Sequence, residues 1–146
     1  MSEKKSQGKT ALSKEDYETL ADFRYAMREF LKFSKDAAES VGLTTQQHQA
    51  LLAIKGAARS PNGITNGELA ERLHIKHHSA VGLINRLESQ DLVKREKNDI
   101  DRREIYVALT TRGEELLEQL SAVHHEELQH LAPRLSVILE SLKKKT

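Results

Sequence analysis

Residues 65–109 read TNGELAERLHIKHHSAVGLINRLESQDLVKREKNDIDRREIYVAL, and the spacing of their apolar residues changes from a helical period to a strand period. Thr65 and Glu68 have the spacing of a capping box, in which each side chain binds a free backbone amide at the start of a helix. A short helix is therefore predicted over residues 66–73, followed by a turn at residues 74–76. A second helix, ending at about residues 89–91, is indicated by the apolar stripe of Ala80, Leu83, Ile84 and Leu87.

Two runs of strand-forming residues follow the second helix. Residues 92–95 and 103–109 are rich in β-branched and aromatic side chains, and the polar residues 96–102 separate them. This pattern predicts a β-hairpin with a charged tip. Two short helices joined by a tight turn and followed by such a hairpin indicate a winged helix-turn-helix, here at about residues 44–109.

Longer helix patterns flank this region on both sides. On the N-terminal side, apolar residues recur at three- and four-residue spacing and predict an amphipathic helix over roughly residues 13–40. Gly42 can end this helix, and Thr44 or Thr45 can cap the next one. Residues 1–12 carry no such period and are expected to form a flexible tail.

On the C-terminal side, Thr110 or Thr111 is expected to start another long helix, and Pro133 suits the first turn of a final helix. The sequence thus predicts a mainly α fold with a single domain over residues 13–146, in which helices at about 13–40 and 111–145 flank the winged helix-turn-helix and its small β-hairpin wing. These terminal helices present more apolar positions than a short winged helix can cover. A homodimer formed through them is the favoured explanation, and an intramolecular bundle is the alternative.

The composition limits the classes of protein to consider. The chain has 146 residues, which suits one domain, and no cysteine, which excludes disulfides, thiolate metal sites and a cysteine-based redox switch. No apolar stretch approaches the roughly 20 residues of a membrane-spanning helix, and the polar N-terminus does not resemble a signal peptide. A soluble, cytoplasmic protein is therefore expected. The formal net charge of +1 is too small to indicate nucleic-acid binding by itself.

Sequence patterns typical of enzymes are missing from the chain. It has no glycine-rich phosphate loop, no His-Glu-x-x-His helix, no Gly-x-Ser-x-Gly turn and no cysteine nucleophile. We therefore expect neither an enzyme nor a cofactor.

Three motifs in order along the chain resemble the MarR family of transcriptional regulators. They are ITNGELAERLHI, then SAVGLINRLESQDLVKRE, then the DRR of NDIDRREIYVALTTRG, and the likeness covers nearly the whole chain. The resemblance implies a homodimer that binds pseudo-palindromic operators in double-stranded DNA. Many members repress nearby genes until a small-molecule effector releases them. The two recognition helices of such a dimer would lie about 34 Å apart, one turn of the duplex.

The second helix of the motif keeps its apolar stripe inward, so its other side can enter a major groove. Donors for phosphates and base edges are offered near its start by Lys76, His77, His78 and Ser79. The same outer surface includes Val81, Gly82 and Asn85. Gly82 would allow a close approach to DNA, and neutral drift is the alternative reason for it. By resemblance, Arg86 has a structural role and pairs with a neighbouring carboxylate.

At the predicted wing, Asp101-Arg102-Arg103 matches the Asp-x-Arg pattern of the family. The resemblance implies that Asp101 braces the hairpin and that Arg103 reaches the minor groove or its phosphates, because arginine suits a narrow groove. Arg102 and Lys97 are further candidates for DNA contact. Asn98 stands where the family usually has aspartate, so the exact turn of the wing is left open.

The resemblance also implies a small-molecule pocket where the first two helices meet the winged region. Its candidate residues are Phe23, Arg24, Met27, Phe30 and His48. Aromatic walls with one arginine or histidine would suit a phenolic or aromatic acid effector. Phenylalanine and methionine at helical spacing form a core more often than a ligand wall, so a core role is the alternative.

The seven histidines raise the alternative of a zinc-sensing regulator, since some relatives in the family sense zinc through histidine and glutamate. The candidates would be His48, His124, His125 and His130. No two histidines are four residues apart within one predicted helix, and the spacing of Glu126 and His130 is common on helix surfaces, so no metal site is expected. A non-specific architectural DNA-binding protein is a further alternative, but it would need broader positive charge.

Overall fold

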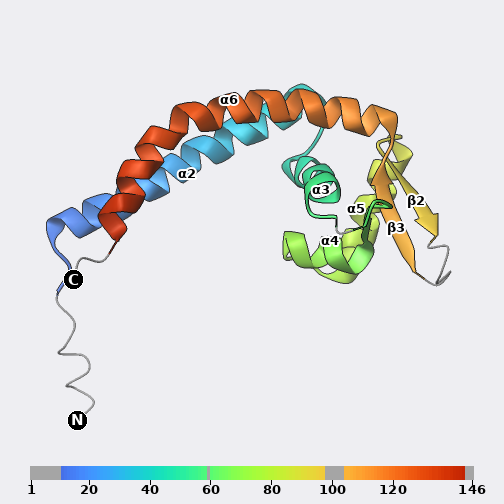
Figure 1. Cartoon of the computed structure of the whole chain (residues 1–146), viewed down its shortest axis with the longest axis horizontal. Coiled ribbons are helices and arrows are strands. Elements are labelled where there is room, and N and C mark those ends of the chain that lie inside the picture. Colours follow the sequence, from blue (N-terminus) through green and yellow to red (C-terminus); the bar gives the residue numbers. More distant parts are fainter. Residues whose placement is uncertain (1–10, 59, 98–103, 144–146) are drawn as a thin grey trace, which may run out of the picture. The chain divides into compact units, whose positions relative to one another are not determined.

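The computed structural model describes residues 11–58, 60–97 and 104–143. Its elements, labelled in Figure 1, are α2 (Lys14–Ser40), α3 (Thr45–Gly56), β1 (Ile64–Thr65), α4 (Asn66–Leu73), α5 (His77–Ser89), β2 (Val93–Lys97), β3 (Ile105–Leu109) and α6 (Thr111–Leu142). The predicted mainly helical fold with a small β-hairpin is confirmed. In the described part of the chain, no helix is apolar over the length needed to span a membrane.

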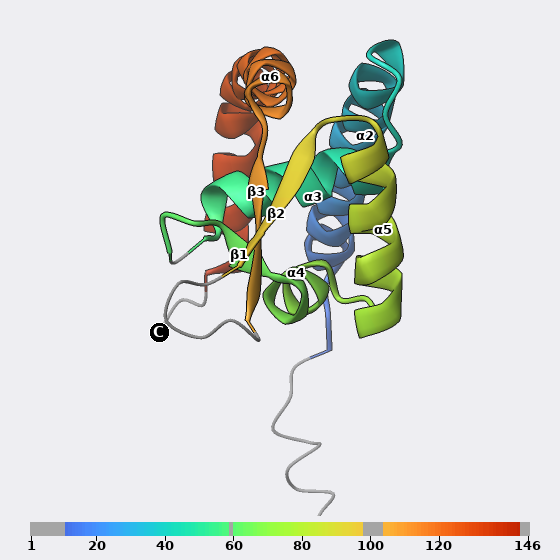
Figure 2. The same cartoon turned by 90° about the vertical axis from the view of Figure 1, so that its right-hand side faces the viewer.

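The chain divides into two compact units. The winged unit comprises Ser34–His124, and the terminal-helix unit joins the residues before Ser34 to those after His124. The winged unit contains α3, α4, α5 and an antiparallel sheet of order β1-β3-β2. Figure 2 shows α4 and α5 beside this sheet. Fully buried side chains from each layer, among them Leu51, Leu69, Ile84 and Val107, form its core.

Threonine caps fix the starts of α3 and α4. The Thr44 hydroxyl accepts a hydrogen bond from the Gln47 amide at 3.0 Å, and the Gln47 side chain accepts one from the Thr44 amide at 3.0 Å. Thr65 and Glu68 form the same reciprocal pair at the start of α4, so the predicted capping box is confirmed. Of the two threonines considered for α3, Thr44 is the cap.

The strand β1 was not predicted from the sequence. It pairs with β3 through Ile64 and Val107, and a strand of two residues is too short to give an alternating pattern. Gly63, which precedes it, has a φ of +113°, and a Cβ atom there would overlap the backbone carbonyl of Val107. Glycine at position 63 therefore allows this segment to join the sheet.

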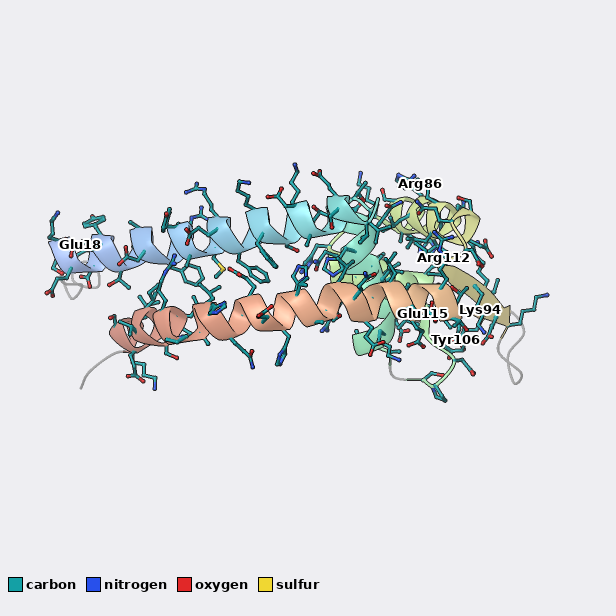
Figure 3. All side chains as sticks on the ribbon, turned by 90° about the horizontal axis from the view of Figure 1, so that it is seen from above. Glu18, Arg86, Lys94, Tyr106, Arg112 and Glu115 are labelled. Atoms are coloured by element: carbon teal, nitrogen blue, oxygen red, sulfur yellow. The ribbon has the colours of Figure 1, made fainter. Side chains whose placement is uncertain are left out.

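In the terminal-helix unit, the N-terminal part of α2 and the C-terminal part of α6 lie antiparallel and side by side (Figures 1 and 3). Their small core consists of Ala26, Leu131 and Ile138, packed against Phe23, Phe30 and Leu135. Arg134 donates from Nη2 to Glu29 Oε1 at 2.7 Å and lies 5.4 Å from the centre of the Tyr25 ring. The hydrogen bond from Arg134 lowers the pKa of Glu29.

Helix α6 runs without a break from Thr111 to Leu142, so the prediction of a separate final helix beginning at Pro133 is wrong. Proline has no N–H, so the helix loses the hydrogen bond to the carbonyl of the residue four positions earlier, Gln129. Both Gln129 and Pro133 are exposed, so water can bind that carbonyl. An exposed proline can therefore lie inside this helix without leaving a buried polar group unpaired.

Candidate nucleic-acid interface

Helix α5 has one buried side and one exposed side. Ala80, Leu83, Ile84 and Leu87 are at most 1% exposed, as the predicted stripe requires. The other side carries the candidates for DNA contact: His77, His78, Ser79 and Asn85 are exposed with Lys76 just before the helix, and Val81 and Gly82 are partly exposed. The structure thus places all seven candidates on or directly before one element (Figure 2).

The start of α5 differs from the starts of α3 and α4. Its N-cap residue is Lys76, whose side chain makes no cap hydrogen bond, and its first turn contains no acidic residue. The first amides of a helix have no partner within the helix, and the helix dipole adds partial positive charge there. Together with the charge of Lys76, these free amides suit a phosphate group.

A side chain from the sheet connects α5 to the wing strands. Arg95 on β2 donates from Nη2 to Asn85 Oδ1 at 2.7 Å, and its Nη1 forms an ion pair with Glu88. Sequence reasoning missed Arg95 and assigned Asn85 only to DNA contact. Asn85 and Glu88 are three residues apart and thus share one side of the helix, which was the available signal. The Asn85 oxygen thus accepts a hydrogen bond from Arg95, and its amide nitrogen can donate to a DNA group.

Arg86 is exposed, and within the described residues it makes no ion pair. The expectation that Arg86 pairs with a neighbouring carboxylate is therefore not met by any described side chain. Glu88, the acidic residue nearest along α5, pairs with Arg95 instead. Arg95 therefore neutralises Glu88, and among the described residues the guanidinium of Arg86 has no carboxylate partner.

Only part of the predicted wing is described. Lys97 is the last residue of β2, lies opposite Ile105 and is exposed. Strand β2 thus extends two residues beyond the predicted end at Arg95. Asp101, Arg102 and Arg103 lie outside the described residues. Their roles stay predictions.

The five candidates for a ligand pocket are divided between the two units. Phe23 and Phe30 pack against the core of the terminal-helix unit, Met27 is partly buried there, and Arg24 is exposed. His48 belongs to the winged unit and is 2% exposed. The packing of the two phenylalanines agrees with the core alternative, and the shared pocket stays a prediction.

His48 is buried beside other polar residues in the winged unit. Its ring centre lies 4.7 Å from that of His124, and among the described residues its Nδ1 atom has no hydrogen-bond partner. Burial, with a smaller contribution from His124, lowers the pKa of His48 from 6.5 to about 4. His48 is therefore neutral at pH 7.

His124 on α6 makes one hydrogen bond within its own helix and one to α2. Its Nδ1 lies 2.7 Å from the Leu120 carbonyl and its Nε2 lies 2.8 Å from the Ser34 hydroxyl. A carbonyl only accepts, so Nδ1 carries the proton and Nε2 accepts from Ser34. In the described ranges, no three histidine, cysteine or acidic side chains gather as a metal site would require. His125 and His130 are exposed on α6.

Comparison with known proteins gives matches along most of the chain. Residues 41–104 match the MarR family. The organic hydroperoxide resistance transcriptional regulator of Bacillus subtilis is 27% identical in an alignment of 128 positions that covers 81% of this chain and 84% of that protein. The transcriptional activatory protein BadR of Rhodopseudomonas palustris is 36% identical over 88 residues, or 58% of this chain. The match spans about half, 48%, of the length of BadR.

Solved structures share the fold. The transcription regulator MepR of Staphylococcus aureus has a TM-score of 0.68 at 22% identity, covering 83% of this chain and 96% of that one. A mutant of MepR bound to an oligodeoxyribonucleotide has a TM-score of 0.68 at 23% identity, with 83% and 95% covered. A mutant of MarR from E. coli has a TM-score of 0.66 at 21% identity, with 92% and 100% covered. The arrangement of helices and wing strands is therefore that of these regulators.

Proposed function

We propose that the chain, whose residues 41–104 match the MarR family, is a DNA-binding transcriptional regulator that binds a pseudo-palindromic operator as a homodimer with α5 in the major groove. The observation that carries this proposal is the two-sided character of α5. Its apolar side is buried in the winged unit, and its opposite side is polar, exposed and free of acidic residues in the first turn. A major groove about 12 Å wide admits such a helix.

The proposed contacts divide by chemistry. Lys76, His77 and the free amides at the start of α5 bind phosphates, which set the position of the helix. His78 and Ser79, with Val81 and Gly82 on the same surface, lie close to base edges, and Asn85 contributes its amide nitrogen. In the MepR mutant structure the relative is bound to an oligodeoxyribonucleotide, which supports the same use of this fold here.

For the wing we propose contacts in the adjacent minor groove. Arg103 enters the groove or binds its phosphates, Asp101 braces the hairpin, and Arg102 and Lys97 add backbone contacts. The support is the exposed position of Lys97 at the end of β2 and the direct tie from β2 to α5 through Arg95. This tie holds the base of the wing beside the helix that would enter the major groove.

The proposed partner of the terminal-helix unit is a second copy of the chain. Large apolar side chains remain exposed on its two helices: Tyr17 is 60% exposed, Leu20 47%, Val137 68% and Leu139 51%. Burying such side chains is favourable at roughly 25 cal/mol per Å². A two-fold dimer would present two α5 helices about 34 Å apart, matching the half-sites of a pseudo-palindrome.

We further propose that the protein represses nearby genes and that a phenolic or aromatic acid effector releases it. The effector would act by binding more tightly to the dimer conformation in which the α5 spacing does not fit the operator. The support is the buried His48 with an unpartnered Nδ1 atom among the described residues.

The direct test compares two duplexes at fixed salt concentration: the intergenic DNA beside the gene of this protein and a scrambled duplex of the same composition. We expect selective binding of the intergenic DNA, and a loss of roughly 1–3 kcal/mol in binding free energy for Arg103→Ala, as for one specific contact. Arg112→Ala, which removes an exposed arginine at the start of α6, is the control. Equal affinity of the wild type for both duplexes contradicts the operator proposal for that DNA.

A further inference from the structure

The guanidinium of Arg86 lies over Gly82, one turn earlier in α5. A Cβ atom built at Gly82 would be 3.7 Å from Arg86 Nη1. Arg86 is exposed, and in the described ranges its side chain has no ion pair or hydrogen bond. In Figure 3 it lies on the edge of α5 that is turned away from Lys94 and the strands. The charged group therefore lies near position 82 on the exposed part of the helix.

Helix geometry explains this placement. Side chains in an α-helix tilt toward the N-terminus, so residue 86 covers the surface above residue 82. At 3.7 Å a Cβ atom at position 82 would be in ordinary van der Waals contact with the guanidinium. The end of the Arg86 side chain therefore lies on the same exposed surface of α5 as Gly82.

The two arginines near this helix differ in what neutralises them. Arg95 on β2 is held by Glu88 and Asn85, so its charge is used within the protein. Arg86 lies about 200° around the helix from Glu88 at 100° per residue and has no such partner in the described part of the chain. An unneutralised guanidinium on the exposed side of a helix is free to bind an anion.

We propose that Arg86 is a further DNA-contacting residue, which binds a backbone phosphate. The proposal rests on the proposed function. Guanidinium is permanently charged and its planar fork matches phosphate oxygens. The N-terminal residues of a recognition helix make most of its contacts with bases. Arg86 lies in the last turn of α5, beside the surface that would face the groove. A phosphate at the groove edge is the ligand that fits this position.

The test is the salt dependence of binding to the operator and to the scrambled duplex. Loss of one phosphate contact lowers the slope of log affinity against log salt by about one. For Arg86→Ala we expect this decrease, with affinity falling by a similar factor on both duplexes. Arg86→Lys should retain the slope because it keeps the charge. Arg112→Ala, the matched arginine on α6, should leave the slope and affinity unchanged (Figure 3).

Thermal unfolding of every variant identifies any that have lost their fold. Arg86→Gln, which removes the charge and keeps a long polar side chain, then carries the comparison in place of Arg86→Ala, and it should lower the slope in the same way.

The outcomes separate this inference from the proposed function. Operator preference in the wild type, with unchanged slope and affinity in Arg86→Ala, overturns the role of Arg86 and leaves the function standing. A loss confined to the operator would assign Arg86 to a base edge and also overturns the phosphate contact. If the wild type shows no operator preference, the proposed function fails, while a lower slope for Arg86→Ala on either duplex still supports the phosphate contact.

Discussion

Because His48 is buried, the stability of the fold should depend on pH. His48 is 2% exposed, its ring lies beside that of His124 in a tilted arrangement, and burial lowers its pKa to about 4 from the 6.5 of a free histidine. Because the folded pKa is the lower of the two, the unfolded chain binds more protons once the pH falls below 6.5. The stability that His48 contributes is therefore complete above 6.5 and is lost as the pH falls toward 4.

The replacement His48→Leu should remove this pH dependence. Between about pH 7 and about pH 5, we expect His48 to account for at most about 2 kcal/mol of lost stability, and this part should vanish in the variant. Urea unfolding at the two pH values measures it. His125→Leu, which changes an exposed histidine on α6, should keep the wild-type dependence because His48 is still present. An identical pH response in wild type and His48→Leu would show that the buried imidazole is not responsible.

At the scale of elements, the contact between α5 and β2 sets how the two parts of the DNA-binding surface are held. Arg95 joins them through Asn85 and Glu88. Its side chain is 25% exposed and that of Glu88 is 44% exposed, so water screens the ion pair. Such a pair contributes about 0–1 kcal/mol, and the hydrogen bond to Asn85 about 0.5–1.5 kcal/mol.

Arg95→Ala should therefore cost roughly 1–2 kcal/mol of unfolding free energy. Operator affinity should fall as well, because the wing strands are no longer tied to α5. Chemical denaturation and duplex binding measure the two effects. Lys94→Ala is the matched control: Lys94 is the neighbouring residue of β2, and among the described residues its ion pair is with Glu96 on the same strand. Unchanged operator binding by Arg95→Ala would mean that the wing and α5 do not depend on this tie.

Local signals in the sequence accounted for most of the elements. The capping box of Thr65 and Glu68 and the stripe on α5 depend on residues close in the chain, so both were predicted correctly. Strand β1 depends on a pairing with β3, more than 40 positions later, and on the glycine at position 63. Such contacts leave no periodic signal. Pro133 was misleading because proline is tolerated inside a helix when its surroundings are exposed.

The candidate site could be predicted only as far as one helix face. The position of the exposed residues on α5 follows from its period, but the partners of their side chains do not. Arg95 reaches Asn85 from another element, and the guanidinium of Arg86 points back along α5 toward Gly82. These contacts depend on tertiary packing and on rotamers, which a single sequence does not specify.

At the scale of the whole molecule, the formal net charge is only +1, so the total charge contributes little to DNA affinity. The affinity has to come from where the positive side chains lie and from the presence of two DNA-binding surfaces in one dimer. One α5 reads only a few base pairs. A two-fold dimer doubles the contacts and adds the spacing between half-sites as a criterion of specificity. The exposed apolar side chains of the terminal-helix unit are the surface on which we expect this pairing.

The most direct test of the central claim, a dimer that reads two half-sites, is to change their spacing. A footprint on the operator first locates the two protected half-sites, about 10 base pairs apart from centre to centre. Inserting about 5 base pairs between them turns one half-site to the opposite face of the duplex. We predict that the affinity of the purified protein then falls to that for scrambled DNA. An affinity unchanged by the insertion would contradict the account, because it would mean that each copy of the chain binds DNA on its own.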